Sequence, residues 1–144
     1  MQKSIILSAL LALLLPALPV VAAEPIPLRA GPLTMSFDAD NVFLRYLRVG
    51  EHEVLRGINA PIRNQNWATV APEVSNLKVD DGGDHFRVTF DVRCAQAEVD
   101  FRWKGTITGT AEGVVEFSFD GEAHSAFKRN RIGFCVLHGP SAAG

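Results

Sequence analysis

The chain has 144 residues, with 14 basic and 16 acidic side chains, a formal net charge of −2 and a composition that is 47% hydrophobic. The slight negative charge argues against a nucleic-acid-binding protein, because contacts to phosphates require a basic stripe. The length accommodates one domain with a real core, and no internal repeat or low-complexity linker divides it.

Residues 1–23 have the pattern of a secretory signal peptide. Lys3 precedes an apolar run over residues 5–21, and small residues end at Ala23, directly before the first acidic residue. A charged start, an apolar centre and small residues at the cleavage position define such a signal. A retained membrane anchor is the alternative, but two prolines interrupt a run that needs about 20 apolar residues to span a bilayer. We predict cleavage near Ala23, a periplasmic or secreted product and no membrane attachment afterwards.

The second half of the mature chain has the period of two that is typical of half-buried strands. Over residues 84–94 apolar and polar side chains alternate, and two further runs, 98–108 and 115–120, repeat the pattern. Short connections join the three runs. The simplest product is an antiparallel meander with one face toward solvent.

The first half is also strand-like but less regular. Residues 33–38 alternate, and the Asp-Ala-Asp-Asn segment after them predicts a turn. Residues 42–49 and 53–58 flank Gly50-Glu51-His52 as a predicted hairpin. Residues 61–72 are expected to form a long excursion over the sheet, followed by a turn at the Asp-Asp-Gly-Gly cluster before the meander.

The last strand candidate, residues 131–138, is apolar at both parities. Such a strand is expected to be buried on both faces. No stretch has an apolar period of 3.6 residues, so helices should be minor. We predict an all-β antiparallel sandwich over residues 24–138, with a loose tail at 139–144.

Cysteine and histidine usage leaves one question open and predicts no metal. Cys94 and Cys135 lie 41 positions apart, and an oxidising compartment would permit them to pair. The alternative, to which we give equal weight, is that both cysteines are buried free thiols that pack as small hydrophobic residues. The four histidines lack ligand spacing and there is no C-x-x-C motif. No metal or other cofactor is predicted.

The sequence carries no motif for a catalytic nucleophile. There is no G-x-S-x-G, and no carboxylate pair is set apart by apolar surroundings as glycoside cleavage requires. We therefore assign no catalytic residue.

Two segments contain candidates for ligand or partner binding. Arg56, Arg63 and Trp67 could form a sugar platform, with an aromatic face and guanidinium donors. Asn66, beside Trp67, is a further candidate. The more expected alternative is that Trp67 caps the core, because large aromatic side chains dominate cores.

The second candidate segment is Lys128-Arg129-Asn130-Arg131, which places three cations in four residues beside an apolar stretch that ends at His138. It could bind a carboxylate or an acidic sugar. A solvated turn is the alternative and is the usual role of a charge run. Arg129, Arg131 and His138 complete the set of ligand or interface candidates.

Four motifs resemble the N-terminal region of the D-apionate lactonase family. The most specific is RNRIGFCVLH at residues 129–138; similar segments lie at 53–58, 62–67 and 101–105, and the likeness spans roughly residues 31–138. The resemblance implies a β-sandwich, similar to the sugar mutarotase supersandwich, that precedes a catalytic TIM-type barrel. It also implies that the full enzyme opens the lactone of an apiose-derived sugar acid.

One departure shapes the expected function. The family motif continues from histidine to proline, whereas this sequence has His138-Gly139-Pro140 and ends at Gly144. We therefore expect an incomplete sandwich, a truncated or split relative without activity of its own, and partnership with a barrel domain or self-association through residues 131–138. A free-standing exported domain that binds carbohydrate or another envelope protein is the alternative.

Overall fold

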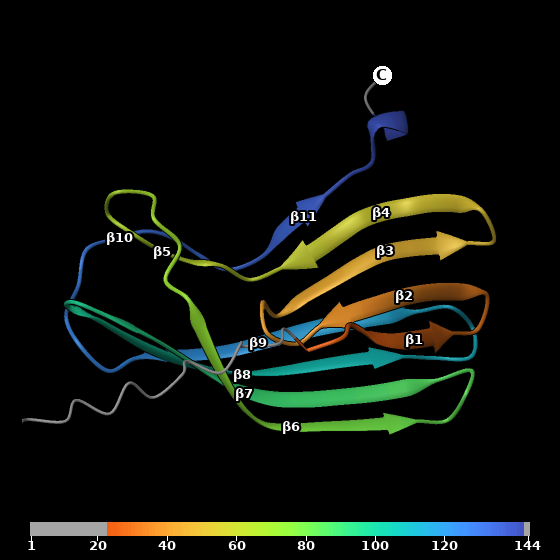
Figure 1. Cartoon of the computed structure of the whole chain (residues 1–144), viewed down its shortest axis with the longest axis horizontal. Helices are drawn as coiled ribbons and strands as arrows, with labels where there is room; N and C mark the ends of the chain where they lie inside the picture. Colours follow the sequence, from red (N-terminus) through yellow and green to blue (C-terminus); the bar gives the residue numbers. More distant parts are fainter. Residues whose placement is uncertain (1–22, 143–144) are drawn as a thin grey trace, which may run out of the picture.

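The structure, a computed structural model, describes residues 23–142, so the predicted leader, except its last residue, lies outside the described residues. Two antiparallel sheets pack face to face, and a separate two-stranded sheet lies at one end of them (Figure 1). This confirms the expected all-β sandwich. The first sheet has the order β1-β2-β3-β4-β11 and consists of Ile26–Ala30, Leu33–Asp38, Phe43–Val49, His52–Asn59 and Cys135–Leu137.

The second sheet contains the predicted meander and one further strand. Its order is β6-β7-β8-β9, formed by Pro72–Asp81, Phe86–Gln96, Val99–Gly109 and Val115–Ala123. Along β7 every second side chain is buried, as the alternation predicts. Gln96 pairs with Val99, so two residues make the turn between β7 and β8. The first of them, Ala97, has a φ of 51°, a left-handed conformation that tight hairpins require.

The strands β1 and β6 were not predicted, and their burial explains why. β6 is mostly exposed and has no continuous alternation. β1 has five residues, includes a proline and lies at the edge of the first sheet. β1 does bury Leu28 and Ala30 at alternate positions, but five residues are too few for a period to be recognised. β6 is an exposed edge strand, and such a strand carries little apolar pattern.

The core lies between the two sheets. Phe37 of β2 stacks on Phe90 of β7 with ring centroids 5.4 Å apart, and Phe90 meets Trp103 of β8 edge-on at 5.5 Å. Such aromatic pairs add to the free energy gained from burial. The largest fully buried side chains are Phe37, Leu44, Ile62, Ile107, Val70 and Val88.

The prediction for residues 131–138 was wrong. Gly133, with a φ of 127°, separates two short strands that belong to different sheets: β10 (Arg129–Ile132) and β11. β11 is an edge strand beside β4, and Val136 and Leu137 are exposed to 48% and 39%. The apolar pattern did not reveal this, because side-chain polarity does not say whether a covering layer is present.

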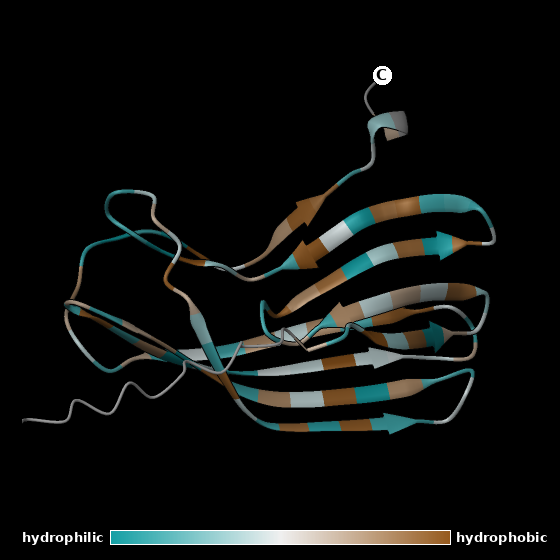
Figure 2. Ribbon diagram, in the orientation of Figure 1, coloured by the Kyte–Doolittle hydropathy of each residue, from teal (hydrophilic) through white to brown (hydrophobic). Residues whose placement is uncertain are grey.

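The two-stranded sheet pairs β10 with β5 (Ile62–Asn64). It lies at the left end of the sandwich in Figure 1. Its loops are largely hydrophilic, whereas β11 is hydrophobic (Figure 2). The described part of the tail forms a short 3-10 turn, Pro140–Ala142. The described residues form no α-helix, and none of their helical segments is long and apolar enough to cross a membrane.

Candidate functional site

The two predicted candidate segments meet at the β5–β10 sheet. Arg131 lies directly opposite Arg63, and Arg129 lies opposite Asn64, although the segments are more than 60 positions apart in the chain. We call the group formed by Arg63, Trp67, Lys128, Arg129 and Arg131 the cationic corner. Strand pairing thus joins what the sequence presented as two separate candidates.

Asn64 organises the loop that carries Trp67. Its side-chain Oδ1 accepts hydrogen bonds from the backbone N–H groups of Asn66 at 2.9 Å and Ala68 at 3.2 Å. Its backbone carbonyl accepts a further bond from the Trp67 N–H at 3.1 Å. The Asn64 N–H in turn donates to the Ala68 carbonyl at 3.0 Å. One residue therefore makes four hydrogen bonds to the backbone of this loop.

Trp67 does not cap the core, so that expectation was wrong. Its side chain is 58% exposed, and its φ of 67° is left-handed. Bulky residues rarely adopt this conformation, and it persists only where the surrounding structure enforces it. The Asn64 hydrogen bonds supply that enforcement, and the result is an indole ring presented to solvent.

The cations of the corner are not neutralised. Among residues 23–142, the side chains of Arg63, Lys128, Arg129 and Arg131 form no ion pair and donate no hydrogen bond. The Nε atom of Arg63 is buried and lacks a partner. Like charges directly opposite each other across strands are destabilising. The Arg63–Arg131 pair is therefore locally unfavourable without an anion.

A shallow hollow of about 500 Å³ adjoins the corner. The loop residue Gln65 and the segment 126–128 line it, together with Glu98, the one carboxylate among its lining residues. Arg63 also lies beside Trp67, with its guanidinium carbon 6.0 Å from the ring centroid, the outer limit of a cation–π contact.

Arg56 and His138 do not join the corner. The Nε atom of Arg56, on β4, donates to Glu53 Oε1 at 2.7 Å. His138 follows β11 in the first sheet and is exposed. The platform predicted from Arg56, Arg63 and Trp67 is therefore only partly assembled, and Arg129 and Arg131 take the place of Arg56.

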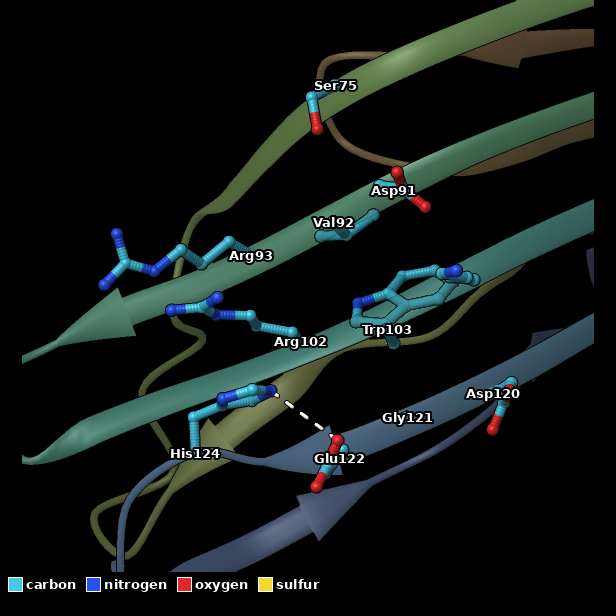
Figure 3. Close-up of a pocket in the computed structure, with 11 residues that line it drawn as sticks. Ser75, Asp91, Val92, Arg93, Arg102, Trp103, Asp120, Gly121, Glu122 and His124 are labelled. Carbon is cyan, nitrogen blue, oxygen red and sulfur yellow. Dashed lines mark ion pairs between the residues drawn. The ribbon is translucent and has the colours of Figure 1, made fainter.

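A second hollow, of about 480 Å³, lies on the outer face of the second sheet (Figure 3). Its charges come from neighbouring strands in register: Asp91, Lys104 and Asp120 form one row. A second row contains Arg93 and Arg102, opposite Glu122, which lies 3.7 Å from His124 Nε2.

The carboxylate of Asp100 neutralises the two arginines of this second hollow. Arg93 donates to it through Nε and an η nitrogen at 3.2 Å, and Arg102 donates at 3.4 to 3.5 Å. These hydrogen bonds lower the pKa of Asp100 to about 2. The sequence analysis assigned these residues to a solvated face. The feature of the sequence that could have indicated this hollow is the placement of charged residues at alternate positions of β7, β8 and β9.

The cysteines are both free thiols in the structure. Cys94 points into the core, and burial raises its pKa to about 11. Cys135 is half-buried on β11. No group of three or more His, Cys, Asp or Glu side chains within residues 23–142 is arranged to hold a metal ion.

Comparisons with known proteins identify the family. Residues 17–144 match the family described as D-apionate lactonase, N-terminal domain. A D-apionate lactonase of Brucella anthropi is 32% identical over 123 residues, which cover 81% of this chain and 19% of that relative. The chain thus spans about a fifth of the relative's length, and no solved structure matches it. The chain belongs to the D-apionate lactonase N-terminal domain family.

Proposed function

We propose that this chain is a non-catalytic accessory domain of a lactonase-type protein, and that it docks on the catalytic part through the open end of its sandwich. The observation that carries the proposal is the uncovered apolar surface beside β11, the last strand of the domain. We define this surface by Phe134, Val136 and Leu137 and call it the β11 surface. All three side chains are more than a third exposed.

The geometry of the β11 surface fits a missing neighbour. β11 pairs with β4 on one side, and its other edge has no strand partner within residues 23–142. Phe134 reaches across to the second sheet, where its ring centroid lies 5.0 Å from that of Phe117 and 6.2 Å from that of Phe119, both on β9. β9 is also an edge strand. The surface therefore spans two open edges, and open edges favour pairing with another segment.

Covering this surface would be favourable. Full burial of one exposed large apolar side chain contributes about 1.5 to 3 kcal/mol. Because the three side chains are only 39 to 48% exposed, covering them would contribute about 2 to 4 kcal/mol in total, a substantial part of the stability of a domain. An interface of this kind is what a domain needs when it remains attached to a larger protein.

The relative supplies the occupant to which we commit. About four fifths of the Brucella anthropi D-apionate lactonase lies outside the matched segment. We propose that polypeptide equivalent to this remainder covers the β11 surface and carries the catalytic residues, and that the assembled protein acts on a sugar-acid lactone. The leader pattern of residues 1–23 supports assembly after export, in the periplasm or outside the cell.

Co-production tests the docking. The chain would be produced alone and together with the polypeptide encoded immediately downstream of it, and both samples would be analysed by size-exclusion chromatography with light scattering at micromolar concentration. We expect the chain alone to self-associate or aggregate and the pair to form a one-to-one complex. Val136→Glu should abolish the complex. Val114→Glu is the matched control, because Val114 is 56% exposed and lies outside the β11 surface.

A soluble monomer that melts cooperatively and binds no downstream product would refute the docking proposal. The second candidate function, a free-standing exported domain that binds carbohydrate or an envelope protein, would then be preferred. It is favoured by the assembly of the cationic corner, which lies outside the β11 surface. Unrelated genes downstream would also support it.

A further inference from the structure

We propose that the cationic corner is a binding site for a carboxylate-bearing saccharide, with Trp67 stacking on a sugar ring and Arg63 and Arg131 holding its carboxylate. This inference goes beyond the accessory role. It applies to either candidate function, because none of its residues belongs to the β11 surface, and its failure would leave the docking proposal intact.

The pairing of Arg63 with Arg131 indicates an anionic ligand. Side chains directly opposite in an antiparallel pair lie on the same face with Cβ atoms about 4.5 to 5.5 Å apart. At this spacing two guanidinium groups can both donate to one carboxylate, and arginine is well suited to such planar recognition. No carboxylate of the described residues pairs with either arginine. The Nε of Arg63 also has no partner, but it is buried and is therefore not accessible to a ligand from solvent.

Most arginines elsewhere on the described surface have a carboxylate partner, with Arg29 and Arg87 as the exceptions. Arg45, Arg48, Arg56, Arg93 and Arg102 each pair with a carboxylate. The two arginines of the hollow in Figure 3 are consequently neutralised by Asp100, which lies outside its lining. Where arginines cluster on the second sheet a carboxylate therefore neutralises them, whereas the arginines that cluster at the corner have no carboxylate partner.

The indole of Trp67 indicates that the anion is carried by a sugar. An exposed aromatic ring offers a flat apolar face for the C–H groups of a pyranose, and the polar groups around it fix orientation. The Asn64 hydrogen bonds fix the backbone of the loop that carries this ring, so little backbone freedom is lost when a ligand binds. Inorganic phosphate would use the arginines but would gain nothing from the ring.

The hollow beside the loop provides room for more than one sugar unit. Gln65 and Lys128 line it with an amide and an ammonium group, and the carboxylate of Glu98 also lies there. Nucleic acid also combines anionic groups with stacking rings, but contacts along its phosphate backbone require a longer basic stripe than this corner supplies. A short acidic oligosaccharide requires only the local cluster of cations.

Calorimetric titration of the purified chain with trigalacturonic acid tests the site. We expect saturable binding that weakens with added salt, because the contacts are charge-assisted. Trp67→Ala and Arg131→Gln should each weaken binding about tenfold or more, the loss expected for one stacking or charged contact. Arg87→Gln is the matched control. It removes the same charge, and Arg87 is an exposed arginine of β7 that lies outside the corner.

Further measurements separate a ligand site from a structural role. The melting temperature of Arg131→Gln should equal or exceed that of the unmodified chain, because the substitution removes the repulsion between Arg131 and Arg63. The fully methyl-esterified trisaccharide should bind at least about tenfold more weakly. The proposal would be overturned if the acid did not bind, or if the ester bound as tightly as the acid. It would also be overturned if phosphate bound as tightly as the trisaccharide and Trp67→Ala did not weaken phosphate binding.

Discussion

Gly105 is the residue that allows the central aromatic contact of the core. It occupies an inward-facing position of β8, directly opposite Phe90 in the ladder. A Cβ atom at this position would overlap the Phe90 ring. Because Phe90 also stacks on Phe37 of the opposite sheet, the ring cannot move aside without disturbing the contact between the sheets.

Gly105→Ala is therefore expected to destabilise the domain by about 1 to 3 kcal/mol, the usual cost of overpacking. Chemical denaturation followed by tryptophan fluorescence measures this change. Thr106→Ala serves as the control, because Thr106 lies on the opposite face of β8 and should change stability by less than about 0.5 kcal/mol. An unchanged midpoint for Gly105→Ala would contradict the packing argument.

The thiol of Cys94 should be unreactive in the folded chain. With a pKa raised to about 11 by burial, almost none of it is thiolate at pH 8, and the thiolate is the reactive form. Titration with a chromogenic disulfide should modify Cys135 first and Cys94 only in denaturant. The unfolded thiol ionises at a lower pH than the folded one, so the free energy of unfolding should fall as the pH rises from about 9 toward about 11. Rapid modification of both thiols would show that Cys94 is not buried.

At the scale of elements, Asp100 joins three parts of the second sheet. Its carboxylate binds Arg93 of β7 and Arg102 of β8. Its backbone carbonyl accepts a hydrogen bond from the N–H of His124, the residue after β9, and its backbone N–H donates to Ser125 Oγ at 2.9 Å. One residue thus fixes the path of the chain as it leaves the sheet toward the cationic corner.

This arrangement predicts an acid-sensitive contribution to stability. The pKa of Asp100 is lowered to about 2 from an ordinary value of 3.8. The contribution is therefore present above pH 4 and is lost as the pH falls from about 4 to about 2. Asp100→Asn should reduce the dependence of the melting temperature on pH in that window. Because the ion pairs of Asp100 with Arg93 and Arg102 are accessible to solvent, added salt should also reduce this contribution to stability.

At the scale of the whole molecule, the purified chain should not hydrolyse sugar lactones. Neither the sequence nor residues 23–142 supply an activated nucleophile or a group of potential metal ligands. A lactonase assay with D-apionolactone and several other sugar lactones measures this directly. Turnover that disappears on substitution of a single residue of this chain would refute the accessory role.

Export of the chain is predicted to remove the first 23 residues. The order of one charge, an apolar run and small residues is the basis for this prediction. Intact-mass spectrometry of the protein from the cell envelope should find a chain that starts at Glu24. A chain that keeps Met1 would indicate a membrane anchor instead.

The extent to which the fold was predictable differs from strand to strand. The residues of β7, β8 and β9 alternate strictly, and the structure follows them closely. β6 lies at a sheet edge with most of its side chains exposed, so no apolar period marked it. Gly133 interrupted the apolar run before β11, but a glycine within a strand pattern does not say which sheet each half will join.

By itself, the sequence determined the all-β class, the meander, the lack of a nucleophile motif and the family resemblance, because each of these depends on residue type or local period. Only the tertiary structure decided that Arg63 lies opposite Arg131, that Trp67 is exposed and that β11 is uncovered. The physical reason is that strand pairing and burial depend on contacts between segments far apart in the chain. Local alternation fixes which side chains share a face, but not which strand lies beside it or what covers it.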